Sequence, residues 1–208
     1  MMIIGRGMRA AWRRGRRGPA WPALLTLLLL AGCAGRLVPP EEPVAPVTVY
    51  LLDHGRHASL VLPREDGRLA RYSYGDWHWY VEGRRGLLSG LAALLWPTPG
   101  ALGRGLGEGD GDPRALAPEG VERVHSLRVE RRRVQALRRR LDARFAAAGA
   151  APVRSADFGL DFVPHPRAYW FPHQSNLVVA DWLRELGVEV GGSPWLSDWR
   201  LVPGSAAF

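Results

Sequence analysis

Runs of alternating apolar and polar residues dominate the chain after residue 46. Val47 to Leu52 and His57 to Leu62 have the period of β-strands, and Leu69 to Tyr74 repeats it after Asp66-Gly67. An Asp-Gly pair between two such runs is typical of a hairpin turn. The pattern therefore predicts a small antiparallel meander.

Helical spacing appears further along. From Glu130 onward apolar residues recur every three or four positions among many arginines, which predicts an amphipathic surface helix ending near Gly149. A second helix is expected to begin after Ser175, to be apolar nearly all round, and to stop at Gly187. The expected fold class is α+β: a small antiparallel sheet packed on this central helix, with the arginine-rich helix outside.

Three segments are harder to interpret. The apolar stretch from Leu87 to Trp96 fits a buried short helix or an apolar lid. The glycines from Gly100 to Gly111 match no phosphate-binding or dinucleotide-binding motif and predict a flexible loop. Phe158 to Phe162 alternates like a strand, which Pro164 and Pro166 are expected to close.

The first 33 residues have the layout of an export signal. Six arginines precede an apolar run from Ala23 to Leu30, which is far shorter than the roughly 20 residues that cross a bilayer. Leu30-Ala31-Gly32-Cys33 resembles the lipobox of bacterial lipoproteins, in which the cysteine is acylated and becomes the new N-terminus. The resemblance implies an envelope protein anchored through lipid on Cys33. It also implies the outer membrane, facing the periplasm, because Ala34 rather than aspartate follows.

Removal of the signal changes the charge. Six of the 28 basic residues leave with it and no acidic residue does, so the formal net charge falls from +8 to +2. The mature chain also lacks a zinc-knuckle, helix-turn-helix or aromatic-basic signature, so we expect no nucleic-acid partner. Residues 34–46 are rich in proline and predict an extended tether, which leaves residues 47–208 as one domain.

Three motifs of this domain, taken in order, resemble a known family. A histidine precedes small and apolar strand residues (His57 to Leu62), Tyr74-Gly75-Asp76 follows, and a tyrosine-containing approach leads to a helix that opens with Ser175-Asn176. This order is similar to that of the circularly permuted papain-like domains of the NlpC superfamily. More narrowly, it is similar to a bacterial family of that type whose function is unassigned. The resemblance covers most of Val47 to about Val190.

The resemblance implies roles for particular residues. His57 would be the general base, Ser175 would stand where the family has its nucleophilic cysteine, Asn176 would be the retained neighbour, and Asp76 or Tyr74 would orient the imidazole. A thiol beside histidine at a helix N-terminus loses its proton readily. A serine hydroxyl needs a base within about 3.2 Å and an oxyanion hole. Serine is also a favoured N-cap residue, which by itself explains Ser175.

No cofactor is implied by these motifs. The other histidines have no metal-ligand spacing and are expected on exposed loops; they are His54, His78, His125, His165 and His173. A zinc site made from His54, His57 and a distant third ligand stays open as an alternative.

Three functional hypotheses follow. In the first, a lipid-anchored pseudoenzyme keeps the papain-like cleft and binds a periplasmic ligand: a peptidoglycan peptide, an acyl group or a protein partner. In the second, Ser175 and His57 hydrolyse amide or ester bonds. In the third, the protein is a structural lipoprotein whose tryptophans form core, and an open pocket lined by Trp77, Trp79 and Trp170 would count against it.

Overall fold

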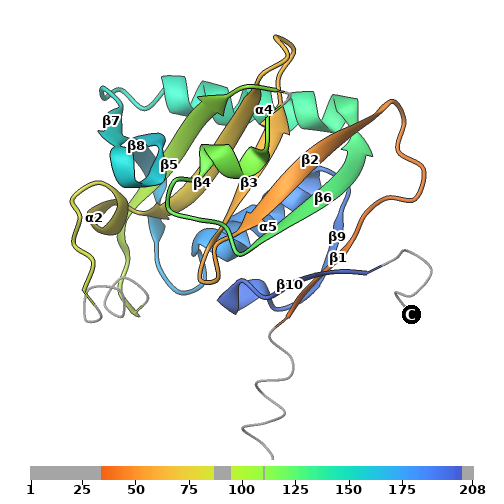
Figure 1. Ribbon diagram of the computed structural model, residues 1–208. Helices are drawn as coiled ribbons and strands as arrows, with labels where there is room; N and C mark the ends of the chain where they lie inside the picture. The colour runs from red at the N-terminus through yellow and green to blue at the C-terminus, as the bar shows by residue number, and fades with distance from the viewer. Residues whose placement is uncertain (1–33, 87–94, 110, 203–208) are drawn as a thin grey trace, which may run out of the picture. The chain divides into compact units, whose positions relative to one another are not determined.

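The computed structural model describes residues 34–86, 95–109 and 111–202, which form an α+β fold (Figure 1). The strands are β1 (Gly35–Val38), β2 (Pro46–Asp53), β3 (Ala58–Pro63), β4 (Leu69–Asp76), β5 (Thr98–Gly107), β6 (Arg123–Glu130), β7 (Val153–Ser155), β8 (Leu160–Tyr169), β9 (Glu189–Gly192) and β10 (Trp199–Leu201). The α-helices are α2 (Trp77–Tyr80), α4 (Arg131–Ala146) and α5 (Ser175–Glu185). Three short 3-10 turns are η1 (Pro113–Leu116), η2 (Ala156–Phe158) and η3 (Pro194–Leu196).

The main sheet has seven strands in the order β6-β2-β3-β4-β5-β8-β7, all paired antiparallel. The predicted meander is confirmed, because β2, β3 and β4 pair in sequence order. The turn at Asp66-Gly67 places Gly67 at φ +80°, a left-handed conformation that glycine adopts without strain. The sheet is larger than this meander, because β6 extends it beyond β2, and β5, β8 and β7 extend it beyond β4.

The two faces of this sheet are covered differently. Alternate strand residues, such as Leu60, Tyr72 and Tyr74, pack with α4 and α5 in one large core. The residues between them face the other way, where α2, η1 and η2 lie in front of the sheet (Figure 1). Both predicted helices are therefore present, and both lie on one face.

The glycine-rich segment is a strand, not the flexible loop that its composition suggests. β5 lies between β4 and β8 and pairs with both. Its glycines leave room for neighbouring groups. A Cβ on Gly103 would come within 2.6 Å of the Phe162 ring, and one on Gly105 within 2.9 Å of the Gly159 carbonyl oxygen. Glycine in a strand commonly marks such a close approach.

Pro164 and Pro166 do not end their strand. β8 runs past both of them to Tyr169. The reason is the sheet edge: β7 pairs only with Leu160 to Phe162, so within the described chain the rest of β8 has β5 as its single partner strand. A proline whose missing N–H faces an edge removes no ladder hydrogen bond.

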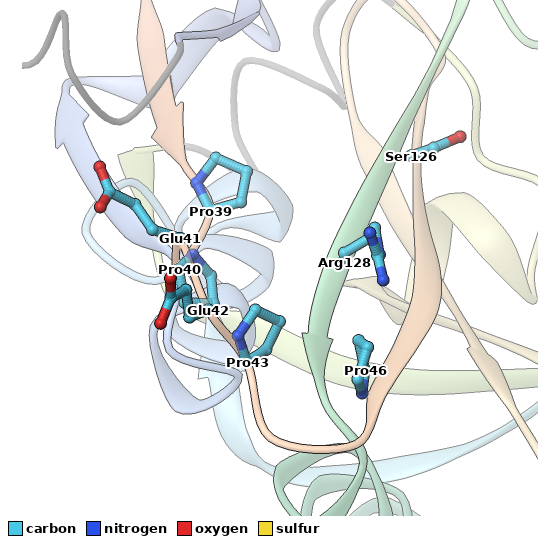
Figure 2. A pocket seen from close by; sticks show the side chains of 8 residues that line it. All are labelled: Pro39, Pro40, Glu41, Glu42, Pro43, Pro46, Ser126 and Arg128. Atoms are coloured by element: carbon cyan, nitrogen blue, oxygen red, sulfur yellow. The ribbon is translucent and has the colours of Figure 1, made fainter.

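The predicted tether is shorter than residues 34–46. Gly35–Val38 is strand β1, paired with β9 and β10 in a second, three-stranded sheet, and Leu37 is fully buried. The prolines that follow carry the chain across to β2. Between them and β6 lies an open groove of about 430 Å³, and Figure 2 shows its lining: Pro39, Pro40, Glu41, Glu42, Pro43, Pro46, Ser126 and Arg128. No catalytic residue expected from the sequence lines this groove.

Several expectations fall outside the described residues. The signal segment with Cys33 is one, and most of the apolar stretch from Leu87 to Trp96 is another. Leu95 and Trp96, which are described, are 58% and 66% exposed. Among the helices that the structure describes, none has the length and apolar character to cross a membrane.

Candidate functional site

A buried polar network surrounds His54, in the turn between β2 and β3. His54 Nδ1 lies 2.6 Å from the Gly120 carbonyl oxygen, which can only accept, so Nδ1 carries the proton. Nε2 is then the acceptor, 2.9 Å from Ser59 Oγ and 3.2 Å from Arg71 Nη2. Burial, helped by the neighbouring His57 and Arg71, lowers the pKa of His54 to about 3. His54 is therefore a neutral, fully hydrogen-bonded histidine.

Arg71 joins this network to the loops in front of the sheet. Its side chain is 1% exposed. Nε donates to Ser59 Oγ at 2.9 Å, and Nη1 donates to the carbonyl oxygens of Leu116 and Phe158 at 2.8 and 3.1 Å. Both terminal nitrogens also pair with the Glu119 carboxylate, Nη1 lying 3.1 Å from Oε2. Burial opposes the charge on Glu119, but His57 and Arg71 together hold its pKa at about 2.

His57 stacks on this network without completing a hydrogen bond to it. Its ring lies parallel to that of His54, with centroids 4.5 Å apart, and meets the edge of Tyr80 at 5.9 Å. Nε2 is 4.0 Å from Glu119 Oε1, beyond hydrogen-bonding distance, and has no other partner within the described residues. The imidazole is thus held by packing and by the charge of Glu119.

His54, His57 and Glu119 resemble a metal-ligand set, because one atom from each lies within 4.8 Å of the others. The donor chemistry does not fit a cation. The Nδ1 proton of His54 is given to Gly120, so that nitrogen offers no lone pair. The Glu119 carboxylate already faces the Arg71 guanidinium. A divalent ion would have to displace a proton and sit against a buried positive charge, so this trio is part of the polar network around the Arg71–Glu119 ion pair.

Ser175 and Asn176 stand at the entrance of α5, as expected, but Ser175 is not its N-cap. The cap is Gln174, whose Oε1 accepts from the Asn176 backbone N–H at 2.7 Å. Ser175 is the first helical residue, is 4% exposed, and donates from Oγ to the same Oε1 at 3.4 Å. Asn176 Nδ2 donates to the carbonyl oxygens of Arg56 and Trp195. Asn176 thereby ties the start of α5 to the β2–β3 turn and to η3.

The two residues expected to orient an imidazole have other partners. Asp76 Oδ1 accepts from the Trp79 backbone N–H at 2.7 Å and so caps α2. The Tyr74 hydroxyl lies 2.9 Å from His173 Nδ1 and donates to the Arg167 carbonyl oxygen at 3.0 Å. His173 is 7% exposed and the His54 side chain 2%, so both lie in loops as expected but are buried rather than exposed. His125 and His165 lie on strands β6 and β8, not on loops.

His57 and Ser175 belong to neighbouring segments, because Asn176 Nδ2 donates to the carbonyl oxygen of Arg56, but no hydrogen bond joins their side chains. Ser59 and Arg71, which hold His54, alternate with Leu60 and Tyr72, which face α5. The rings of His54 and His57 therefore pack on the face opposite to α5. None of the hydrogen bonds of the described chain links the His57 ring to Ser175, Asp76 or Tyr74. As arranged, these residues do not form the dyad that the resemblance implies.

The most organised polar residues, Arg71 and Glu119, were not foreseen. A signal existed for Arg71, because a single charge interrupts the apolar run Leu69 to Tyr74 and must be paired if that strand is buried on both faces. Glu119 stands between Pro118 and Gly120 in a connecting loop and gave no comparable signal. Comparison with known proteins finds no matching family model, no matching curated protein and no matching solved structure.

Proposed function

We propose that this chain is a lipid-anchored protein of the bacterial envelope, with a permuted papain-like domain that does not hydrolyse and acts by binding. The lipobox ending at Cys33 supports the anchor. The papain-like relationship is supported by α5, which opens with Ser175-Asn176 and packs on β3 and β4. The ligand class expected is a peptidoglycan peptide, an acyl group or another envelope protein.

One observation carries the non-hydrolytic half of the proposal. The Ser175 hydroxyl is buried against Gln174, while His57 packs on the far face of the sheet beside Glu119. A serine nucleophile needs a base at hydrogen-bonding distance to remove its proton during attack. Neither residue offers that partner to the other.

The test uses a soluble form beginning at Ala34, which contains no cysteine, and introduces one by Ser175→Cys. The alkylation rate against pH gives the thiol pKa. A helix N-terminus by itself lowers a thiol pKa, so the decisive comparison is with His57→Ala added. We expect the same pKa with and without His57. Ser126→Cys, at an exposed position, is the matched control and should titrate near about 8.5.

A thiol pKa at position 175 that rises when His57 is replaced would contradict the proposal, since the two side chains would then share a proton. Covalent capture of the native Ser175 by a fluorophosphonate would do so directly. Binding is tested separately, by titrating the soluble form with a peptidoglycan stem peptide and following amide shifts by NMR.

A purely structural lipoprotein is the second candidate, and the tryptophans favour it. Trp182 and Trp199 are core residues, and Trp77 and Trp79 pack against the cluster around Tyr80 and Phe158. A lipidated protein that binds no envelope ligand or surface would support this candidate.

A further inference from the structure

Exposed aromatic side chains gather at one end of the domain. Trp170 and His173 close a tight turn through two backbone hydrogen bonds, His173 N–H to Trp170 O at 2.9 Å and Trp170 N–H to His173 O at 3.4 Å. Phe171 lies in this turn and is 51% exposed, and Trp170 is 40% exposed. The Phe171 ring contacts that of Trp195 in η3, with centroids 3.6 Å apart.

Trp96 belongs to the same end. It lies two residues before Thr98, which pairs with Tyr169 where β8 leaves the sheet, and it is 66% exposed. We call Trp96, Trp170, Phe171 and Trp195 the aromatic patch. The exposed Arg56 is close to it, because Asn176 Nδ2 donates to the carbonyl oxygens of both Arg56 and Trp195, at 3.2 and 3.3 Å.

The start of the folded chain lies beside this patch. Gly35 opens β1, and its N–H donates to the Asp198 carbonyl oxygen at 2.7 Å. A Cβ on Gly35 would come within 2.9 Å of Pro194 Cβ, so this glycine lies against η3, the element that carries Trp195. Figure 1 shows the beginning of β1, η3 and the connection from β8 to α5 at the same, lower end of the domain.

We infer that the aromatic patch is a membrane-binding surface, whose partner is the interfacial region of a phospholipid bilayer. The inference rests on the proposed lipid anchor at Cys33. Two residues span at most about 7 Å, so an acylated Cys33 would hold Gly35, and with it η3, close to the headgroups. A domain on so short a connection must place some part of its surface against the membrane.

The chemistry of the patch fits that environment. Tryptophan is enriched at membrane interfaces because its ring is apolar and its indole N–H can meet water or headgroups. Exposed apolar rings that gather on one surface mark a contact site. Trp96, Trp170 and Phe171 are exposed, and the half-buried Trp195 lies against Phe171. An arginine beside them suits anionic headgroups. The acyl chains would keep the protein on the membrane, and the patch would decide which end of the domain faces it.

The experiment uses the full-length protein, lipidated in cells and reconstituted into phosphatidylethanolamine and phosphatidylglycerol vesicles. With Cys33 consumed by lipid, Phe171→Cys supplies a single free thiol for a nitroxide. The matched control is Val153→Cys on β7, an apolar residue of similar exposure, at 41%, at the opposite end of β8. The readout is the collision rate of each nitroxide with oxygen, which enters the bilayer, relative to a polar nickel chelate, which does not.

We expect the oxygen-to-nickel ratio at position 171 to be several-fold higher than at position 153. It should fall to the control value when Trp96, Trp170 and Trp195 are all changed to serine, while the acylated protein still floats with the vesicles. Equal ratios at the two positions in a protein that is acylated and floats would overturn this inference and leave the lipid anchor standing. Spin–spin broadening at position 171 that grows with protein density would assign the patch to a second copy instead. A protein recovered without acyl groups in the soluble fraction would overturn the anchor and the inference together.

Discussion

Arg71 and Glu119 form a buried, two-point ion pair, in which Arg71 Nη1 donates to Glu119 Oε2 and Nη2 donates to Oε1. Arg71 comes from the centre of β4 and Glu119 from the loop after η1, so the pair fastens a loop to the middle of the sheet. The same guanidinium also orients Ser59 and His54. The polar residues nearest to His57 therefore fix the loop that carries Glu119 to the face of the sheet opposite to α5.

Replacing Arg71 by methionine should be severe, because it leaves the Glu119 carboxylate buried without its partner. We expect a loss of about 3 to 5 kcal/mol in the free energy of unfolding. Adding Glu119→Gln should recover part of that loss, since the uncompensated charge is then gone. The matched control is Arg154→Ala, which removes the exposed pair with Asp161 and should cost less than about 1 kcal/mol. Urea denaturation of the soluble domain measures all four proteins, and equal losses for the two single variants would contradict the role given to Arg71.

Stability should fall as the pH drops below about 6.5. The folded-state pKa of His54 is about 3 against 6.5 for a free histidine, so between these values the unfolded state binds the extra proton. The free energy of unfolding therefore increases with pH over this range. Titration of His54 alone should lower it by about 2 kcal/mol from pH 7 to pH 5. Glu119, with a pKa of about 2 against 4.5, adds a further loss only below about pH 4.5.

The His54 share is isolated by His54→Gln, whose amide can still donate and accept. The difference in unfolding free energy between the native protein and this variant should narrow from pH 7 to pH 5. His165 provides the comparison, because burial also lowers its pKa, to about 4, and so His165 keeps part of the slope in the variant. A pH profile that is identical in both proteins would mean that His54 titrates normally when folded.

The capping of α5 gives a paired test on adjacent residues. Gln174→Ala removes the acceptor of the Asn176 N–H and the donor to the Trp195 carbonyl oxygen, so it should cost about 1 kcal/mol or more. Ser175→Ala removes the long 3.4 Å bond to Gln174 Oε1 and should cost about 0.5 kcal/mol or less. Thermal unfolding of both variants measures the two losses. A larger loss for Ser175→Ala than for Gln174→Ala would show that Ser175, not Gln174, caps the helix.

Gly75 should tolerate no side chain. A Cβ there would come within 2.1 Å of Tyr80 Cε2, and Tyr80 in turn meets the His57 ring. Gly75→Ala should therefore displace Tyr80 and destabilise the fold by about 1 to 3 kcal/mol. Gly191→Ala is the control, because its nearest neighbour would be Arg36 Cβ at 3.9 Å. Chemical shifts of the Tyr80 and His57 rings would move in the first variant and stay unchanged in the second.

The local periodicity of the sequence determined much of the fold. Strands β2, β3 and β4 and helices α4 and α5 lie where alternating or helical spacing predicts them, and the α+β class follows from these elements. Such patterns are reliable because each buried face must be apolar at the period of its own element. Gly187, at φ +86° just after α5, is a stop signal of the same local kind.

Other features of the fold depend on contacts between segments that are distant in the sequence, and only the tertiary structure decided them. By sequence, the glycines of β5 resemble a loop. In the structure they are strand residues, and Phe162 and Gly159 fill the space that side chains would occupy. By sequence, Gly35–Val38 resembles a tether. In the structure it is a strand, because it pairs with β9 and β10 from the other end of the chain. The sequence motifs predict that His57 and Ser175 act together. Where each side chain points depends on strand register and on the partners Glu119 and Gln174. Periodicity carries no information about such partners, because a buried polar group is satisfied by whichever segment the fold brings beside it.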